Sequence, residues 1–260
     1  MNPYDRIYNE DGTVNTNLAW DLNNPLYEAL LGSFAKDGTH SFVNNTDFRW
    51  DINKEFRLTG HFSITSTLGW ADTFTSPKSQ YYKNQPDLTK RGQLVKSTMS
   101  TTNWSANVVS TYNKMFKDNS LISASLGWEA THSKDKSETT EAIGFFNDHL
   151  SFIGNAAGYP TDSQPGGSQG ETATVGAFLT ANYSYRNRYF LDGTWRTTGS
   201  SQFGENNRWG NFWSAGAGWN ILNESFMKDI KKNIDLMKLR FSMGYTGKVN
   251  FSPYQAMTMY

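Results

Sequence analysis

The chain has 260 residues, enough for one or two domains, and its 24 basic residues balance its 24 acidic residues. The zero net charge argues against a nucleic-acid partner, and the absence of cysteine excludes disulfides and thiolate metal sites. No apolar run approaches the ~18 residues of a membrane helix. This composition is usual for soluble proteins, but it also fits a membrane β-barrel, whose strands dilute apolar residues with polar ones.

The chain begins with a stretch, residues 1–38, that looks like a loop and lacks the basic start and apolar core of a signal peptide. We therefore expect either a cytosolic protein or a chain that is not the whole of a longer one. The first strand is predicted at about 41–52, where Phe42, Phe48, Trp50 and Ile52 share a face. The next, Phe56 to Trp70, alternates for about 15 residues, far beyond the ~5–6 of a globular strand.

Six more segments alternate in the same way. They are centred on about 100–113, 122–130, 173–185, 189–195, 213–221 and 239–245. Tight turns are predicted at 53–55, 114–119 and 186–188, and long polar loops at 71–99, 132–170 and 197–211. A short helix is predicted within 222–235. The chain therefore reads as about eight antiparallel strands with short and long connections in turn.

The apolar faces of these strands could meet either a protein core or lipid. A β-sandwich and a membrane barrel share the alternation, and both would keep charge off the apolar face. Three features favour the barrel: polar faces made mostly of Ser, Thr, Asn and Gly, aromatic residues at strand ends, and long loops at only one rim. A soluble sandwich that binds carbohydrate on aromatic loops stays an alternative, as does a complete eight-stranded barrel.

One stretch carries a family likeness. Residues 188–227, "RYFLDGTWRTTGSSQFGENNRWGNFWSAGAGWNILNESFM", and then "MKLRFSMGYTGK" closely resemble the SusC-like (RagA-like) family of TonB-dependent outer-membrane transporters. "NNPLYEALL" and "NTDFRWDINKEFRLTGHF" fit the same family more loosely. Departures from the family pattern include Thr198, Gln202, Trp213, Met237 and Lys248, and they fall in a loop and at strand ends.

The resemblance implies an all-β fold: an antiparallel, up-and-down transmembrane β-barrel segment of about eight long strands from a larger barrel of about 22 strands. Residues 1–260 would form part of the barrel domain, with 1–38 as an extracellular loop, 39–260 as the strands, and the plug domain absent. The family further implies a bacterial outer-membrane importer of glycans or peptides, a SusD-like surface lipoprotein as lid, and TonB contact through the missing plug region.

Enzymatic motifs are weak throughout. Four scattered histidines lack metal-ligand spacing, "TGKV" lacks a full phosphate-loop pattern, and no catalytic constellation is visible, so we expect no enzyme, metal or cofactor. Inward-facing polar residues are expected to solvate the barrel wall or touch the plug, and substrate contact is the sharper hypothesis for some of them. The candidates for contact with substrate or plug are Arg57, His61, Glu129, Asp192, Arg196, Trp209 and Arg240. Loop aromatics that could stack on sugar rings are Tyr81, Tyr82, Phe145, Phe146, Tyr159 and Trp209.

Overall fold

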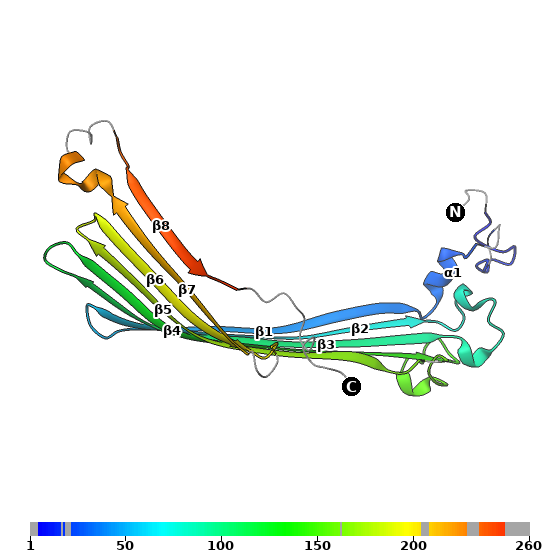
Figure 1. The fold of residues 1–260 in the computed structure, drawn as a ribbon. Coiled ribbons are helices and arrows are strands. Elements are labelled where there is room, and N and C mark those ends of the chain that lie inside the picture. Colours follow the sequence, from blue (N-terminus) through cyan, green and yellow to red (C-terminus); the bar gives the residue numbers. More distant parts are fainter. Residues whose placement is uncertain are drawn as a thin grey trace. The chain divides into compact units, whose positions relative to one another are not determined.

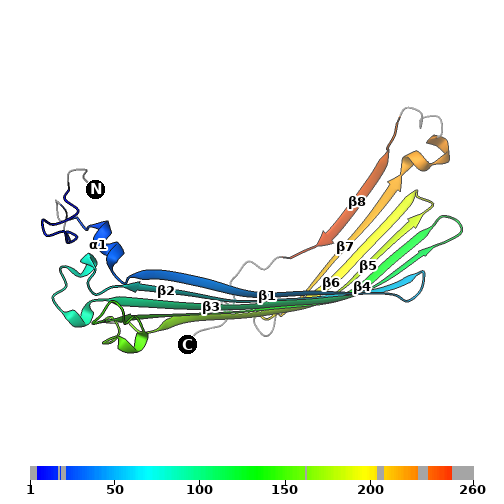
Figure 2. The same ribbon diagram turned by 180° about the vertical axis from the view of Figure 1, so that it is seen from behind.

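The fold comes from a computed structural model, which describes residues 5–16, 18, 22–161, 163–203, 208–227 and 234–247. Eight antiparallel strands form one sheet in sequence order, β1 to β8, and the views from front and back show β5 to β8 side by side in that order (Figures 1 and 2). Their bounds are Phe34–Asp51, Phe56–Thr75, Gln93–Met115, Leu121–Ile143, Gly166–Tyr185, Tyr189–Ser200, Trp209–Asn220 and Lys238–Tyr245.

The all-β, up-and-down prediction is thereby confirmed, and the sandwich alternative is wrong because these strands make one sheet in place of two packed sheets. Helical structure is sparse among the described residues: α1 (Pro25–Leu30) and short 3₁₀ turns at Gln80–Tyr82, Leu88–Lys90, Ile153–Asn155, Ile221–Asn223 and Ser225–Met227. None of the described helices has the length and apolarity to cross a bilayer. The last two turns fall in the predicted helical connection, of which residues 228–233 lie outside the described residues.

The strands run further than the sequence alternation indicates. β2 continues to Thr75 and β3 already begins at Gln93, so the predicted loop at 71–99 is shorter. β4 continues to Ile143 and β5 begins at Gly166, which shortens the predicted loop at 132–170 and places "GGSQGE" in a strand. Many of the added strand residues, such as Lys134–Thr140, are polar on both faces, and a pattern of apolar alternation cannot detect them.

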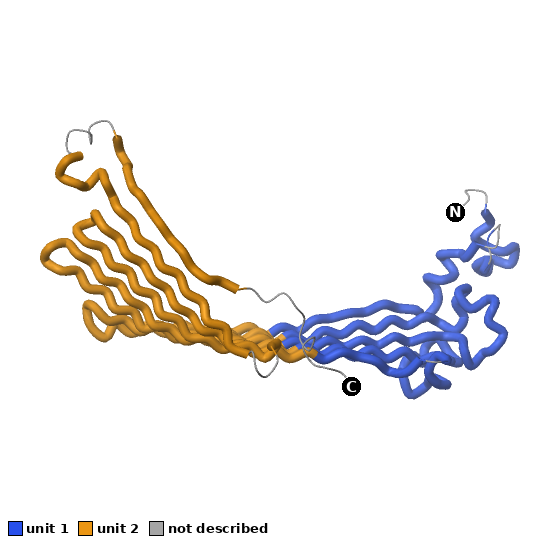
Figure 3. The backbone as a smooth tube through the Cα atoms, viewed as in Figure 1, with its two compact units in different colours: residues 1–41, 67–101, 135–169 blue, residues 42–66, 102–134, 170–260 orange. Residues whose placement is uncertain are grey.

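The chain divides into two compact units, coloured in Figure 3. Unit 1 comprises residues 1–41, 67–101 and 135–169, and unit 2 comprises residues 42–66, 102–134 and 170–260. Strands β1 to β5 contribute residues to both. Unit 1 contains α1 and the connections that follow β2 and β4, and unit 2 contains the tight turns.

Unit 1 has a small core where its connections fold together. Phe74, Leu94, Ala142 and Phe145 are at most 2% exposed, and Phe74 meets Phe145 edge to face at 5.2 Å between ring centroids. Asn24, fully buried, caps α1 by accepting from the Leu26 amide, and its own amide donates to the carbonyls of Ile7 and Asn15. Glu28 of α1 accepts from Ser79 and from the Gln80 amide, which ties α1 to the connection after β2.

Unit 2 is a sheet with one apolar and one polar face. On the apolar face the register aligns Leu179, Trp195, Trp213 and Tyr245 in one row, and Tyr185, Tyr189, Trp219 and Leu239 in another. The two rows are six residues apart along each strand, about 20 Å at ~3.4 Å per residue. Large side chains on this face stay open in the chain: Leu126 is 59% exposed, Leu191 56% and Phe241 67%.

Candidate functional site: a charge-paired face and a glutamate-centred rim

The polar face of unit 2 carries six of the seven predicted contact residues; five of them form ion pairs, and the sixth, His61, contacts a carboxylate. Arg57 Nε donates to Asp51 at 2.6 Å, and Arg49 Nε reaches the other oxygen of the same carboxylate at 2.9 Å. His61 Nδ1 lies 2.8 Å from an Asp47 oxygen. All five residues have odd numbers on β1 and β2, so they project from one face of this strand pair.

Two further ion pairs skip a strand. Arg196 on β6 pairs with Glu129 on β4, across the intervening β5, and its Nε also donates to Thr198 Oγ1 at 3.0 Å. Arg240 on β8 lies 4.0 Å from Asp192 on β6, across β7. These long side chains lie along the sheet surface and do not project away from it.

A glycine on the crossed strand makes room for each of these pairs. A Cβ at Gly176 of β5 would lie 3.1 Å from the Thr197 carbonyl oxygen and 3.5 Å from Glu129 Cγ. A Cβ at Gly216 of β7, directly opposite Asp192, would lie 2.5 Å from a carboxylate oxygen of that residue. The alternation of small residues with Trp213 and Trp219 on β7 therefore has a local cause, because side chains from neighbouring strands cover the glycines.

Trp209 is separated from the other predicted contact residues. It lies opposite Gly199 and has the same strand parity as Trp213 and Ala217, so it belongs to the apolar face. Its ring covers Gly199, where a Cβ would meet ring atoms at 3.1 Å. The indole stays 61% exposed. The sequence pattern predicts Trp209 in the loop at 197–211, but β7 already begins at this residue.

The predicted loop aromatics divide into buried and exposed residues. Tyr82 and Phe145 are buried in unit 1, and burial raises the pKa of the Tyr82 hydroxyl to about 12. Tyr81, Phe146 and Tyr159 are 75%, 74% and 53% exposed, so their rings are accessible. Two of these six residues therefore build the core of unit 1.

A second cluster lies where β7 ends, and its centre is a residue that the contact predictions omit. Glu224 is 9% exposed, and its Oε1 accepts from the Tyr189 hydroxyl at 2.7 Å and from the Trp219 indole nitrogen at 3.0 Å. Arg188 lies 3.4 Å from its other oxygen. The hydrogen bonds from Tyr189 and Trp219 hold the pKa of the Glu224 carboxyl below its usual range.

This glutamate-centred rim (Arg188, Tyr189, Trp219 and Glu224) joins three parts of the family-like stretch. Arg188 and Tyr189 open the "RYFLDG" segment, Trp219 belongs to "GAGWN", and Glu224 belongs to "NESFM". The carboxylate satisfies the polar ends of two neighbouring aromatic side chains, an arrangement expected where aromatic rings lie at an apolar boundary. The sequence signal that could have identified Glu224 is its place in that motif.

The chain is similar in sequence to receptors of one kind, although no family model matches it. It is 29% identical over 260 residues to the TonB-dependent receptor P3 of Formosa agariphila, which covers 98% of this chain and 25% of that protein. It is 47% identical over 76 residues to the TonB-dependent receptor SusC of Bacteroides thetaiotaomicron, covering 29% of this chain and 8% of SusC.

Solved structures agree on the fold. The RagAB peptide importer in its closed-closed state aligns with a TM-score of 0.75 and 19% identity over 95% of this chain and 27% of that one. Its open-open state aligns with a TM-score of 0.74 and 18% identity. The chain spans about a quarter of the length of the receptors that match it along most of its length. The chain is thus SusC-like, as its motif indicates, and it corresponds to a segment of the TonB-dependent receptors.

Proposed function

We propose that this chain forms part of the barrel wall of a TonB-dependent importer in the bacterial outer membrane. The observation that carries the proposal is the contrast between the two faces of unit 2. Side chains such as Leu126, Leu191 and Phe241 are about half or more exposed on one face, whereas the opposite face holds paired charges. Water would penalise this apolar face at ~25 cal/mol per Å², whereas lipid would accept it.

The spacing of the aromatic rows supports the same placement. The row through Trp213 and the row through Trp219 lie about 20 Å apart along the strands, which at the ~35–45° tilt of barrel strands covers about 15 Å of the ~25 Å apolar band of an outer-membrane barrel. Tyr and Trp prefer the two boundaries of a bilayer, because their rings are apolar and their N–H or O–H groups are polar. Leu191 and Ala217, between the rows, would meet the hydrocarbon.

The edges of the sheet support a larger barrel. β1 and β8 are its first and last strands, and they do not pair with each other among the described residues. Unpaired backbone groups in lipid cost several kcal/mol each, so both edges need further strands. We infer that a complete receptor, the longer protein that would carry this segment, supplies them together with a plug.

The paired charges favour a structural role for the polar face. Arg57, Arg196 and Arg240 each have a counter-charge within the sheet, so this face presents little uncompensated charge to a ligand. We infer that the face lines the aqueous lumen and meets the plug. Glycan or peptide selection would then depend on exposed loop aromatics such as Tyr81, Phe146 and Tyr159.

A SusD-like lipoprotein is the proposed partner of unit 1. Tyr81, Phe146 and Phe152 are 72–75% exposed on connections that the core of unit 1 holds in place. Aromatic side chains are enriched at protein interfaces relative to the rest of the surface. RagAB, whose fold this chain shares, is a peptide importer, which makes peptides one of the two substrate classes to test.

Single-cysteine labelling of the complete receptor tests the membrane placement, because this segment has no cysteine of its own. Leu126→Cys on the apolar face should react with a lipid-soluble maleimide and resist a charged one, and Ser125→Cys should show the reverse. Equal labelling of both by the charged reagent would contradict a lipid-facing wall. Uptake of labelled oligopeptides and oligosaccharides, with and without TonB, then tests import and substrate class.

A further inference from the structure

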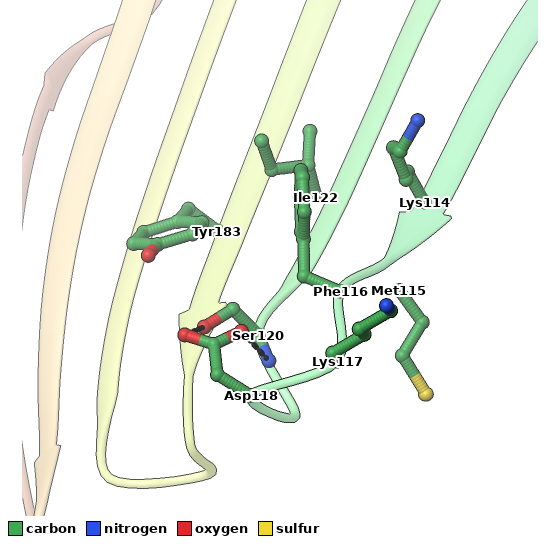
Figure 4. Close-up of a pocket in the computed structure, with 8 residues that line it drawn as sticks. All are labelled: Lys114, Met115, Phe116, Lys117, Asp118, Ser120, Ile122 and Tyr183. Atoms are coloured by element: carbon green, nitrogen blue, oxygen red, sulfur yellow. Dashed lines mark hydrogen bonds between the residues drawn. The ribbon is translucent and has the colours of Figure 1, made fainter.

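The turn between β3 and β4 forms an amphipathic pocket on the apolar face of unit 2. The cavity is about 910 Å³ and is lined by Lys114, Met115, Phe116, Lys117, Asp118, Ser120, Ile122 and Tyr183 (Figure 4). Ile122 and Tyr183 have the parity of the apolar face on β4 and β5, Lys114 lies next to the end of β3, and Phe116 and Lys117 lie in the turn. The pocket thus joins an apolar wall to a cationic end.

The carboxylates next to this turn are already engaged. Glu55 accepts from Lys114, with 3.2 Å between Nζ and Oε1. Asp118 is turned onto Ser120, accepting from its amide at 3.2 Å and from its hydroxyl at 2.9 Å. Figure 4 shows the Lys117 ammonium directed to the Met115 and Lys114 side, away from the Asp118 carboxylate.

Lys117 is therefore available to bind an anion. It forms no ion pair with any carboxylate in the part of the chain that the structure describes. The turn is fixed, because Phe116 and Ser120 are joined by a backbone hydrogen bond of 2.8 Å and Asn119 adopts a positive φ of 61°. The backbone of Lys117 is consequently held beside the apolar wall.

We propose that this pocket binds an anionic phospholipid of the inner leaflet. The acyl chain lies along Phe116, Ile122 and Tyr183, and the phosphate contacts Lys117 with Lys114 beside it. An inorganic anion would use only the lysines and leave the apolar wall uncovered, whereas a phospholipid matches both parts. The proposal rests on the proposed function, because it needs the tight turns to lie at a bilayer surface.

The site would fix this wall in the membrane at a defined depth. Basic residues near an anionic membrane surface each contribute about 1 kcal/mol, and aromatic rings at the same depth add apolar contact. A lysine and three apolar side chains in one pocket would therefore select an anionic phospholipid above a zwitterionic one.

The test is native mass spectrometry of the complete receptor released from detergent after incubation with phosphatidylglycerol or phosphatidylcholine. The receptor should retain phosphatidylglycerol preferentially, and Lys117→Gln should weaken that retention about fivefold. Lys54→Gln is the matched control, because Lys54 lies in the β1–β2 turn, outside this pocket, and forms no ion pair among the described residues. Phe116→Ser should reduce retention of both lipids.

Three results would overturn the site. Equal losses in the Lys117 and Lys54 variants would mean diffuse attraction to the whole rim, and equal binding of the two lipids would mean an unselective apolar groove. Displacement of the lipid by millimolar inorganic phosphate would mean a soluble-anion site.

Cysteine labelling of the same preparation separates the two proposals. If the Leu126 position is lipid-facing but Lys117→Gln has no effect, only the lipid site is contradicted. A receptor whose Leu126 position reacts as if in water contradicts both.

Discussion

Arg196 on β6 reaches across a whole strand to pair with Glu129 on β4, and Gly176 of the crossed strand lies beneath them. The two side chains are 43% and 29% exposed, so the pair itself is worth only ~0–1 kcal/mol. The pair matters for packing, because two side chains that meet across a strand need a small residue on that strand beneath them. The Asp192–Arg240 pair repeats the arrangement over Gly216 of β7.

The first prediction tests this surface. Gly176→Val in the complete receptor should displace Glu129 and crowd the Thr197 carbonyl, at a cost of ~1–3 kcal/mol from overpacking. The measurement is the temperature at which the folded receptor loses its fast, heat-modifiable mobility in gels. Gly193→Val is the control, since a Cβ there meets nothing within 4 Å. A larger loss in the control would refute the steric role of Gly176.

The second prediction concerns Glu224. The pKa of its carboxyl is below the ordinary 4.5, chiefly through the hydrogen bond from Tyr189 and then that from Trp219. A lowered folded-state pKa gives stability that is present above about pH 4.5 and is lost as pH falls through the folded value. The native receptor should therefore melt at a lower temperature as pH falls below 4.5.

Glu224→Gln is the matched variant for that measurement. The amide oxygen can still accept from Tyr189 or Trp219, but the charge facing Arg188 is gone. Melting should be lower than native at neutral pH, and the difference should shrink in acid. A constant difference across the pH range would show that Glu224 acts through shape alone.

The eight strands could be predicted because alternation is a direct signal of a two-faced strand. Phe56 to Trp70 indicate the two faces of β2 from the pattern alone, and the same rule predicts the central part of each of the eight strands. The pattern does not detect the polar extension of β4, because Lys134 to Thr140 show no difference between faces. Only the backbone hydrogen bonds to the neighbouring strands identify such residues as part of a strand.

The candidate site could likewise be predicted only in part. Parity placed Arg57, His61 and Glu129 on the polar face correctly, but no local pattern says that Arg196 pairs with a residue 67 positions away. That partnership depends on which strands are neighbours. The rim at Glu224 depends on the register of β6 and β7, which sets Tyr189 directly opposite Trp219.

The third prediction concerns the core of unit 1. Gly144 has φ +82°, and a Cβ there would lie 2.2 Å from the Thr89 carbonyl oxygen, so Gly144→Ala adds strain and a backbone clash. We expect the connections around Phe145 to open and become sensitive to protease. Gly158→Ala is the control, because Gly158 bridges to Ile143 but leaves open space for a Cβ. Equal proteolysis of both variants would contradict a special role for Gly144.

The last prediction tests the two faces of β2. Its alternation from Phe56 sets Ile64 on the apolar face and Thr65 on the polar face with Arg57 and His61. An arginine on the lipid face of a barrel costs ~2–4 kcal/mol near the midplane, whereas a lumen position tolerates it. Ile64→Arg in the complete receptor should therefore reduce the amount of folded, surface-exposed protein.

Thr65→Arg is the neighbouring control and should leave assembly largely intact, because its side chain joins a face that already pairs cations with carboxylates. The measurement is the yield of each variant in the outer membrane, compared at equal expression. Greater damage from Thr65→Arg would invert the faces, since a shift of one residue exchanges them. Equal damage from both would mean that β2 is buried on both sides, as in the core of a soluble protein, and would remove the basis for a membrane wall.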